Sequence, residues 1–186
     1  SINTVVLDKT GTITQGKPVV TDIIGDEELL TVAASIEKLS EHPLAEAIVN
    51  EAEKRKVELL PVNDFEQIPG QGIKGTVNGA VCMAGNRRMM EANGIEAALL
   101  TRGEELAEDG KTPLFFMRDG KMVGVIAVAD VVKPTSRQAI KELSDMGIEV
   151  VMLTGDNAKT AEAIRRQVGV DRVVAEVLPQ DKETEI

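Results

Sequence analysis

Residues 8–14 read Asp-Lys-Thr-Gly-Thr-Ile-Thr and directly follow the apolar run Val-Val-Leu of residues 5–7. In open α/β sheets, ligands bind at the carboxyl ends of the strands, where such a loop would lie. An aspartate there can attack phosphorus, because carboxylates serve as nucleophiles in phosphoryl transfer. Gly11 allows the backbone to turn sharply and approach an anion, and Thr10 offers a hydroxyl and a backbone N–H. The stretch therefore predicts a phosphoryl-transfer site on an α/β fold.

The string Asp-Lys-Thr-Gly-Thr of residues 8–12 resembles the phosphorylation motif of P-type ATPases, the ion pumps in which an aspartate takes the γ-phosphate of ATP. The resemblance implies that Asp8 is the nucleophile. For an isolated Asp-x-Thr-Gly we would favour an acidic turn after a buried strand, but five matching residues count against that interpretation. Soluble phosphatases with this core usually carry an acid two positions after the nucleophile. Thr10 stands there, and its neutral hydroxyl activates water poorly, so the phosphorylated intermediate is expected to persist.

The composition excludes several classes of function. The 186 residues suffice for one domain or two small ones. A net charge of −10 argues against nucleic-acid binding, which needs a basic surface. The single cysteine, Cys82, excludes an internal disulfide. No apolar run approaches the roughly 18 residues of a membrane-spanning helix. Given the resemblance, we expect a soluble piece of the cytoplasmic loop of a membrane-embedded pump, with the pump's transmembrane and actuator domains as its partners.

Hydrophobic periodicity predicts the order of elements along the chain. We expect a strand at 4–7, a connector at 16–18, a strand at 19–24, helices at 27–39 and 43–52, strands at 64–68, 73–77 and 80–84, helices at 87–93 and 97–109, strands at 114–117 and 122–129, a helix from Pro134, a strand at 148–153, a helix after Asn157 and a strand at 172–175. Asn78-Gly79 and Asp119-Gly120 predict two tight hairpins. The alternation of strands and helices after Asp130 predicts a doubly wound α/β unit.

These patterns predict an α/β fold with an inserted α+β domain. Residues 1–18 and 128–186 should form one domain, because one strand and one loop cannot make a core. Residues 19–127 should form the inserted domain, which contains an antiparallel sheet. The resemblance implies that the first is a haloacid-dehalogenase-like, doubly wound phosphorylation domain, incomplete at its C-terminus. It implies that the second binds nucleotide, with a hinge near Lys17 and Ala129 whose closure carries the γ-phosphate to Asp8.

A second phosphate-contacting segment is expected at Thr154-Gly155-Asp156, which follows a predicted strand as Asp8 does. Alone, this tripeptide would indicate a capped helix start. The resemblance implies that Thr154 is catalytic and donates a hydrogen bond to a phosphoryl oxygen, and that Gly155 and Asp156 bind phosphate with Thr10 and Gly11. Lys182 resembles the lysine that neutralises the phosphoryl charge. Asp130 matches the aspartate where the chain re-enters the phosphorylation domain.

ATP and Mg²⁺ are the cofactors that the resemblance implies. Asp8 and the Thr10 carbonyl would be ligands of Mg²⁺. The third ligand of the family lies in a Gly-Asp-Gly-x-Asn-Asp segment shortly after the lysine, and the sequence ends at Ile186, before it. Because phosphoryl transfer depends on the metal, we expect this chain to phosphorylate poorly or not at all. Loss of terminal strands would expose a sheet edge, so partial disorder is expected near residues 170–186.

His42 is the only histidine and lies in Ser-Glu-His-Pro-Leu, residues 40–44. A lone histidine before a proline is more often a surface or capping residue. The pentapeptide, however, resembles the signature of heavy-metal-transporting P-type ATPases, whose histidine contacts ATP. The resemblance adds Glu37, which would bind the adenine amino group. It also implies that the nucleotide is contacted by Gly70, Gly72, Ile73, Gly85 and Asn86.

The transported ion is not specified by this chain. Residues 169–179 look most like copper(I) pumps, and no cysteine or histidine cluster could bind the transported metal directly. Copper(I) export is therefore the favoured interpretation, with a zinc or cadmium pump as the nearest alternative. Two others are a soluble haloacid-dehalogenase-like phosphatase with a cap domain, and a non-catalytic nucleotide-binding module.

Overall fold

The computed structural model describes residues 3–178 of the chain, which divides into two compact units. Unit 1 comprises Ser1–Lys17, Ala107–Gly110 and Asp130–Ile186, and unit 2 comprises Pro18–Leu106 and Lys111–Ala129. Within the described residues, no helix is both long enough and apolar enough to cross a bilayer.

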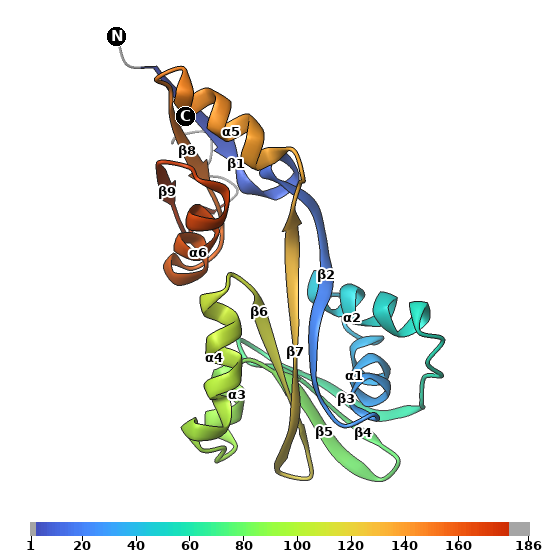
Figure 1. Ribbon diagram of the computed structural model, residues 1–186. Helices are drawn as coiled ribbons and strands as arrows, with labels where there is room; N and C mark the ends of the chain where they lie inside the picture. The colour runs from blue at the N-terminus through green and yellow to red at the C-terminus, as the bar shows by residue number, and fades with distance from the viewer. Residues whose placement is uncertain (1–2, 179–186) are drawn as a thin grey trace. The chain divides into compact units, whose positions relative to one another are not determined.

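Unit 1 contains a three-stranded parallel sheet in the order β1-β8-β9, formed by Thr4–Asp8, Glu149–Leu153 and Arg172–Val174 (Figure 1). Helices α5 (Ser136–Asp145) and α6 (Ala158–Val168) precede and follow β8. Strand β8 is buried along almost its whole length, as its continuous apolar sequence predicts. Residues of both helices and β8 share one core: Ile13, Ile140, Val150, Met152, Ile164, Val168 and Val170.

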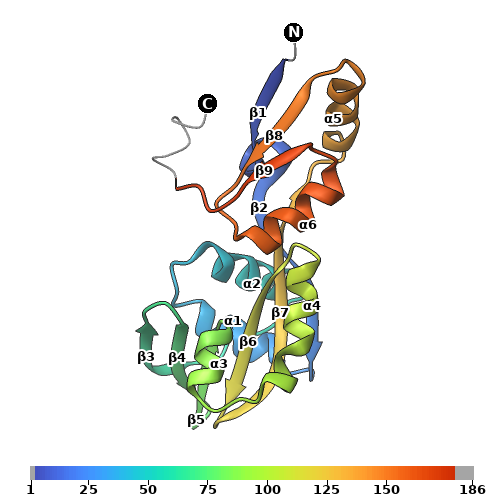
Figure 2. The same ribbon diagram turned by 90° about the vertical axis from the view of Figure 1, so that its left-hand side faces the viewer.

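Unit 2 is built on a six-stranded antiparallel sheet in the order β2-β7-β6-β5-β4-β3 (Figure 2). Its strands are β2 (Thr14–Gly25), β3 (Val62–Ile68), β4 (Gly72–Val77), β5 (Ala80–Gly85), β6 (Thr112–Arg118) and β7 (Lys121–Val132). Both predicted hairpins are confirmed. Each turn has two successive residues at positive φ, Asn78 with Gly79 and Asp119 with Gly120, as a type I′ turn requires.

Two layers of helices cover this sheet. Because side chains alternate along a strand, Phe116 packs into one core, while its neighbours Phe115 and Met117 pack into the other. The first core includes residues of α1 (Leu29–Glu37) and α2 (Pro43–Lys54). The second includes residues of α3 (Arg87–Ala92) and α4 (Thr101–Glu108). The predicted fold class, an α/β unit with an inserted α+β unit, is thus the one observed.

Three sequence predictions about these elements are wrong. The connector at 16–18 lies inside β2, which is continuous because the N–H groups of Gly16 and Lys17 donate to Asp130. The single helix at 97–109 is divided into a 3₁₀ turn, Ala97–Leu100, and α4. The expected disorder does not extend to Arg172–Val174, which form β9 and pair with β8. Residues 179–186 lie outside the described part of the chain.

Candidate functional site

Asp8 and Thr154 lie at the carboxyl ends of two neighbouring parallel strands. Asp8 is the last residue of β1 and is paired in register with Leu153, the last residue of β8. Thr154 follows directly and is almost fully buried. The two predicted loops therefore begin at adjacent positions on one edge of the sheet, where ligands bind in open α/β folds.

The loop after Asp8, Lys9–Ile13, makes one wide turn with Gly11 at a φ of +81°. Its C-terminal residue, Ile13, is hydrogen-bonded to the segment at the beginning of α5. The Ile13 carbonyl accepts hydrogen bonds from Lys133 N at 2.9 Å and from Ser136 Oγ at 2.7 Å. Lys133 Nζ also donates to the Gly11 carbonyl at 3.2 Å. Ile13 is buried in the core, so the turn is held while Thr10 stays exposed to solvent.

Asp156 joins the two loops through one carboxylate oxygen. Lys9 Nζ lies 2.7 Å from Asp156 Oδ2, and the Thr154 hydroxyl donates to the same oxygen at 2.7 Å. Asp156 N donates back to Thr154 Oγ1 at 3.1 Å. The Thr154 hydroxyl must therefore turn away from Asp156 before it can donate to a phosphoryl oxygen. Since an ionised carboxylate only accepts hydrogen bonds, that of Asp156 is suited to position Thr154 and Lys9. The phosphate contact expected of Asp156 stays a prediction.

Asp130 accepts three hydrogen bonds from the beginning of β2. Thr14 Oγ1 donates to Oδ2 at 2.5 Å, and the backbone N–H groups of Gly16 and Lys17 donate to Oδ1 at 3.0 and 3.2 Å. Thr14 is fully buried, and its Oγ1 also lies 3.1 Å from the Lys9 carbonyl. Asp130, where the chain re-enters unit 1, thus fixes the residues that follow the loop Lys9–Ile13. Thr14 ends the opening motif, but its partner 116 positions away has no local sequence signal.

The predicted Mg²⁺ ligands fit that ion in chemical type. Mg²⁺ is held in phosphoryl-transfer sites by one or two carboxylates together with substrate phosphates. Asp8 supplies a carboxylate at a strand end, and the Thr10 carbonyl belongs to an exposed turn. Lys182, the third predicted catalytic residue, lies outside the described residues.

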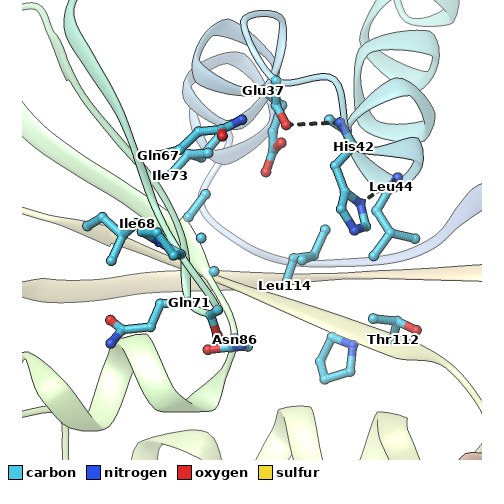
Figure 3. A pocket seen from close by; sticks show the side chains of 18 residues that line it. Glu37, His42, Leu44, Gln67, Ile68, Gln71, Ile73, Asn86, Thr112 and Leu114 are labelled. Carbon is cyan, nitrogen blue, oxygen red and sulfur yellow. Dashed lines mark hydrogen bonds between the residues drawn. The ribbon is translucent and has the colours of Figure 1, made fainter. Parts of the chain in front are cut away.

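Unit 2 contains a cavity of about 460 Å³ between the α1–α2 segment and the ends of β3, β4, β5 and β6 (Figure 3). The structure brings all of the predicted nucleotide-contacting residues to its wall: Glu37, His42, Gly70, Gly72, Ile73, Gly85 and Asn86. These residues come from four separate stretches of sequence. Sequence reasoning missed the side chains of Ile68 and Leu114, which give the cavity apolar walls and carry no motif. It also assigned no ligand contact to Leu44, the last residue of the motif at 40–44, which lines the cavity too.

Glu37 ends α1, and its carboxyl group points into the cavity (Figure 3). The residue is only 6% exposed. Burial raises the pKa of the Glu37 carboxyl to about 7, because the charged form loses hydration. No cation within the described residues pairs with Glu37 in an ion pair. Glu37 is therefore a buried hydrogen-bonding group at the cavity wall, and burial disfavours its charged form.

His42 caps α2. Its Nδ1 accepts a hydrogen bond from Leu44 N at 3.1 Å, and Pro43 occupies the first turn (Figure 3). Since Nδ1 accepts, the neutral ring carries its proton on Nε2, which is left to donate to a ligand. The capping interpretation that the sequence suggests is therefore correct for one ring nitrogen. It leaves the second nitrogen available at the cavity.

Gly72 and Gly85 face each other in register across β4 and β5. A Cβ on Gly72 would lie 2.1 Å from the Ala84 carbonyl oxygen, and a Cβ on Gly85 would lie 2.3 Å from the Gln71 carbonyl oxygen. Both glycines are thus required for backbone packing. Asn86 holds the same loop, because its N donates to the Gln71 carbonyl and its Nδ2 donates to the Gly70 carbonyl, each at 2.9 Å.

Residues 2–186 match the family model described as haloacid dehalogenase-like hydrolase. The chain belongs to this family. It is also 49% identical over 189 residues to a copper-exporting P-type ATPase of Staphylococcus saprophyticus, a match that covers 100% of this chain and 23% of the relative. The chain thus spans about a quarter of the length of the curated relatives that it matches.

Solved structures agree with this assignment. A zinc-transporting PIB-type ATPase in the E2.Pi state superposes with a TM-score of 0.81 at 35% identity, over 100% of this chain and 31% of that chain. The catalytic domain of the CPx-ATPase CopB-B, studied for its conformational changes upon nucleotide binding, gives 0.72 at 27% identity, over 99% of this chain and 65% of that chain. The resemblance to heavy-metal-transporting P-type ATPases is confirmed.

Proposed function

We propose that this chain is the nucleotide-binding and aspartyl-phosphorylation portion of a heavy-metal P-type ATPase that exports copper(I). The observation that carries the proposal is the cavity of unit 2, of about 460 Å³. Residues predicted from four separate stretches of the sequence all line it. This volume lies within the range of small-ligand pockets. In this proposal, unit 2 is the nucleotide-binding domain and unit 1 the phosphorylation domain.

The chemistry of the cavity suits an adenine nucleotide. Apolar side chains such as Ile68 and Leu114 can pack on the faces of a base. The Glu37 carboxyl accepts from the adenine amino group, and His42 Nε2 donates to a phosphate oxygen. A buried acceptor also provides specificity, because a base without a matching donor leaves it unpaired.

In unit 1, the Asp8 carboxylate would attack the γ-phosphorus of ATP. A bond forms between a carboxylate oxygen and phosphorus, the bond from phosphorus to the β–γ bridging oxygen breaks, and ADP leaves with that electron pair. Asp156 positions the Thr154 hydroxyl, which turns to a phosphoryl oxygen as charge develops there. Mg²⁺ bound by Asp8 and the Thr10 carbonyl would neutralise phosphate charge. Thr10 offers no acid–base group, so the aspartyl phosphate persists until another part of the pump acts.

Copper(I) is proposed over zinc on sequence similarity. The copper-exporting relative is 49% identical over 100% of this chain, whereas the zinc-transporting structure is 35% identical over the same extent. The transmembrane and actuator domains would be the partners of this chain in the whole pump, and its two units would then lie on the cytoplasmic side of the membrane. Transport measurements on the whole protein decide between the two ions.

Calorimetric titration with ATP, AMP and a sugar phosphate tests the nucleotide site, using His42→Ala and His42→Asn as a matched pair. Asparagine can still cap α2, so only the alanine variant should lose roughly 1 kcal/mol of stability. Both lack Nε2 and should bind ATP about tenfold more weakly, as expected for loss of one hydrogen bond to a charged group. If the wild-type chain is folded and binds no adenine nucleotide, the proposal is wrong. If the asparagine variant binds normally, His42 acts only as a cap.

The phosphorylation step is tested on the whole pump with radiolabelled ATP and Mg²⁺, because residues 1–186 alone are expected to phosphorylate poorly or not at all. An acid-stable label that disappears in Asp8→Asn supports the nucleophile assignment. A label that turns over rapidly to free phosphate would favour the soluble phosphatase instead. ATP binding without any label would restrict this chain to nucleotide binding.

A further inference from the structure

The cavity of unit 2 has few positive charges to attract the phosphates of the nucleotide that we propose it binds. ATP carries several negative charges, and the whole chain has a net charge of −10. Among the described residues that line the cavity, none is a lysine or an arginine, and the one carboxylate is Glu37. His42 can donate one hydrogen bond. A positively charged side chain at the rim would offset part of the phosphate charge, in addition to Mg²⁺.

Arg88 supplies such a cation at the rim. A Cβ built on Gly70 would lie 3.6 Å from Arg88 Nη1, so the guanidinium lies close to this glycine, which lines the cavity. The contact is well defined, because the Asn86 side chain holds the Gly70 carbonyl at 2.9 Å just before Arg88 in the sequence. Arg88 is exposed to solvent, so its donors can reach a ligand at the cavity mouth.

The neighbouring arginine differs in its partners. Arg87 Nη1 lies 2.8 Å from Glu104 Oε1, and its Nε donates to Glu91. These two carboxylates raise the pKa of the Arg87 guanidinium and offset its charge. In the described part of the chain, Arg88 forms no ion pair within 4.0 Å. Of the two adjacent guanidinium groups, that of Arg87 is thus paired with carboxylates of α3 and α4, whereas that of Arg88 lies near Gly70 at the cavity rim.

We propose that Arg88 is a further nucleotide-binding residue, whose guanidinium contacts the phosphates of a nucleoside di- or triphosphate at the Gly70 rim. The inference rests on the proposed function of the cavity. Guanidinium is suited to the role, because its planar set of donors binds phosphate in a bidentate manner. Arg88 then selects for the length of the phosphate chain, while Glu37 selects for the base.

The test compares Arg88→Gln with Arg87→Gln as the matched control, because both remove one exposed positive charge from the same helix. We expect Arg88→Gln to weaken ATP and ADP binding about fivefold to tenfold, the effect of losing one charged hydrogen-bond pair, and to leave adenosine binding unchanged. Arg87→Gln should change ATP affinity less than about twofold, since its charge is already offset. The difference between the two variants should shrink at high salt, where a solvent-exposed contact is screened.

The outcomes separate this inference from the proposal on which it rests. If the wild-type chain binds neither ATP nor adenosine, the nucleotide site itself is wrong. If the wild type binds ATP and Arg88→Gln binds it equally well, or if both arginine variants weaken it equally, the role of Arg88 is overturned. An equal loss of adenosine and ATP binding in Arg88→Gln would indicate a structural effect and would also overturn it. Arg88→Lys, which keeps the charge, should recover part of the ATP affinity.

Discussion

Lys9 Nζ lies 2.7 Å from Asp156 Oδ2, so an ion pair joins the loop after β1 to the loop after β8. The side chain of Lys9 is 9% exposed and that of Asp156 is 26% exposed. The same oxygen accepts the Thr154 hydroxyl. The position of Asp8 relative to Thr154 is thus fixed by sheet register and by one carboxylate. This arrangement places the Asp8 carboxylate and the Thr154 hydroxyl at one sheet edge.

Replacement of Asp156 by asparagine should destabilise unit 1. It leaves the Lys9 ammonium buried without its anion, and we expect the free energy of unfolding to fall by about 2 kcal/mol. Asp145→Asn is the control, because Asp145 pairs with Lys141 on an exposed helix surface. That variant should lose at most about 0.5 kcal/mol. Urea denaturation measures both, and equally small losses would show that the Lys9 pair contributes no more than a surface pair.

Asp130→Ala should loosen the beginning of β2. It removes the acceptor of the Gly16 and Lys17 amides and of the buried Thr14 hydroxyl. We expect these two amides to exchange with deuterium at least about tenfold faster, because each loses a hydrogen bond that closes the strand end. The Val125 amide, in the middle of β7, serves as the internal control. Unchanged exchange at residues 16 and 17 would mean that strand pairing alone protects them.

Glu37 should make stability depend on pH. The folded chain keeps this proton up to a pKa of about 7, whereas the unfolded chain releases it near the ordinary value of 4.5. The folded state therefore binds more protons between these values, and the free energy of unfolding falls as pH rises from about 4.5 to 7. The total fall is on the order of 3 kcal/mol, at about 1.4 kcal/mol per pKa unit. Above pH 7 this contribution is constant.

Glu37→Gln isolates that effect, since the amide does not titrate. The free energy of unfolding of the variant should therefore fall less between about pH 4.5 and 7 than that of the wild type. The variant should also be more stable than the wild type at pH 8. Glu41→Gln, at an exposed position nearby, should keep the wild-type slope. Thermal unfolding between pH 4 and 8 follows all three proteins. If the stability of the wild type and that of Glu37→Gln depend on pH in the same way, burial does not raise the pKa of the Glu37 carboxyl.

Gly72→Ala should destabilise unit 2 strongly, quite apart from any ligand. The added Cβ would lie 2.1 Å from the Ala84 carbonyl oxygen, so β4 and β5 must separate. We expect a loss of more than about 2 kcal/mol, in the range of overpacked interiors. Gly79→Ala is the control, because its Cβ would meet nothing within 4 Å and only the positive φ of 77° is strained. About 1 kcal/mol is expected there. Chemical denaturation distinguishes the two, and similar losses would show that β4 and β5 adjust to a Cβ at Gly72.

The parts of this fold set by local chemistry could be predicted from sequence. A type I′ turn requires positive φ at both central residues, and Asn78-Gly79 and Asp119-Gly120 tolerate it, so both hairpins followed from residue type. The continuous apolar run of β6 was predicted as a strand, but that its side chains pack into cores on both faces of the sheet emerges only from the structure. The continuity of β2 could not be predicted, because Gly16 and Pro18 break strands locally. It depends on Asp130, more than a hundred residues away.

The candidate site also combines features that the sequence predicts with features that only the structure shows. The motif residues were identified one by one, yet only the fold shows that Glu37, His42 and Asn86 line one cavity. Sequence suggested either capping or nucleotide contact for His42, and the two ring nitrogens allow both. Phosphate contact was expected of Asp156 from its motif. That contact stays a prediction, and the structure adds hydrogen bonds from Lys9 and Thr154 to the Asp156 carboxylate, which no sequence pattern encodes.

The central claim, that the cavity of unit 2 binds an adenine nucleotide, is tested most directly by ATP titration followed in ¹H–¹⁵N NMR spectra. The account predicts saturable shifts of the amides of Glu37, His42, Gly70, Gly72 and Asn86, with little change in α5 of unit 1. AMP should shift the amide of Glu37 and leave those near the Gly70 rim less affected. Spectra that do not change on addition of ATP, or shifts confined to residues outside this cavity, would contradict the account.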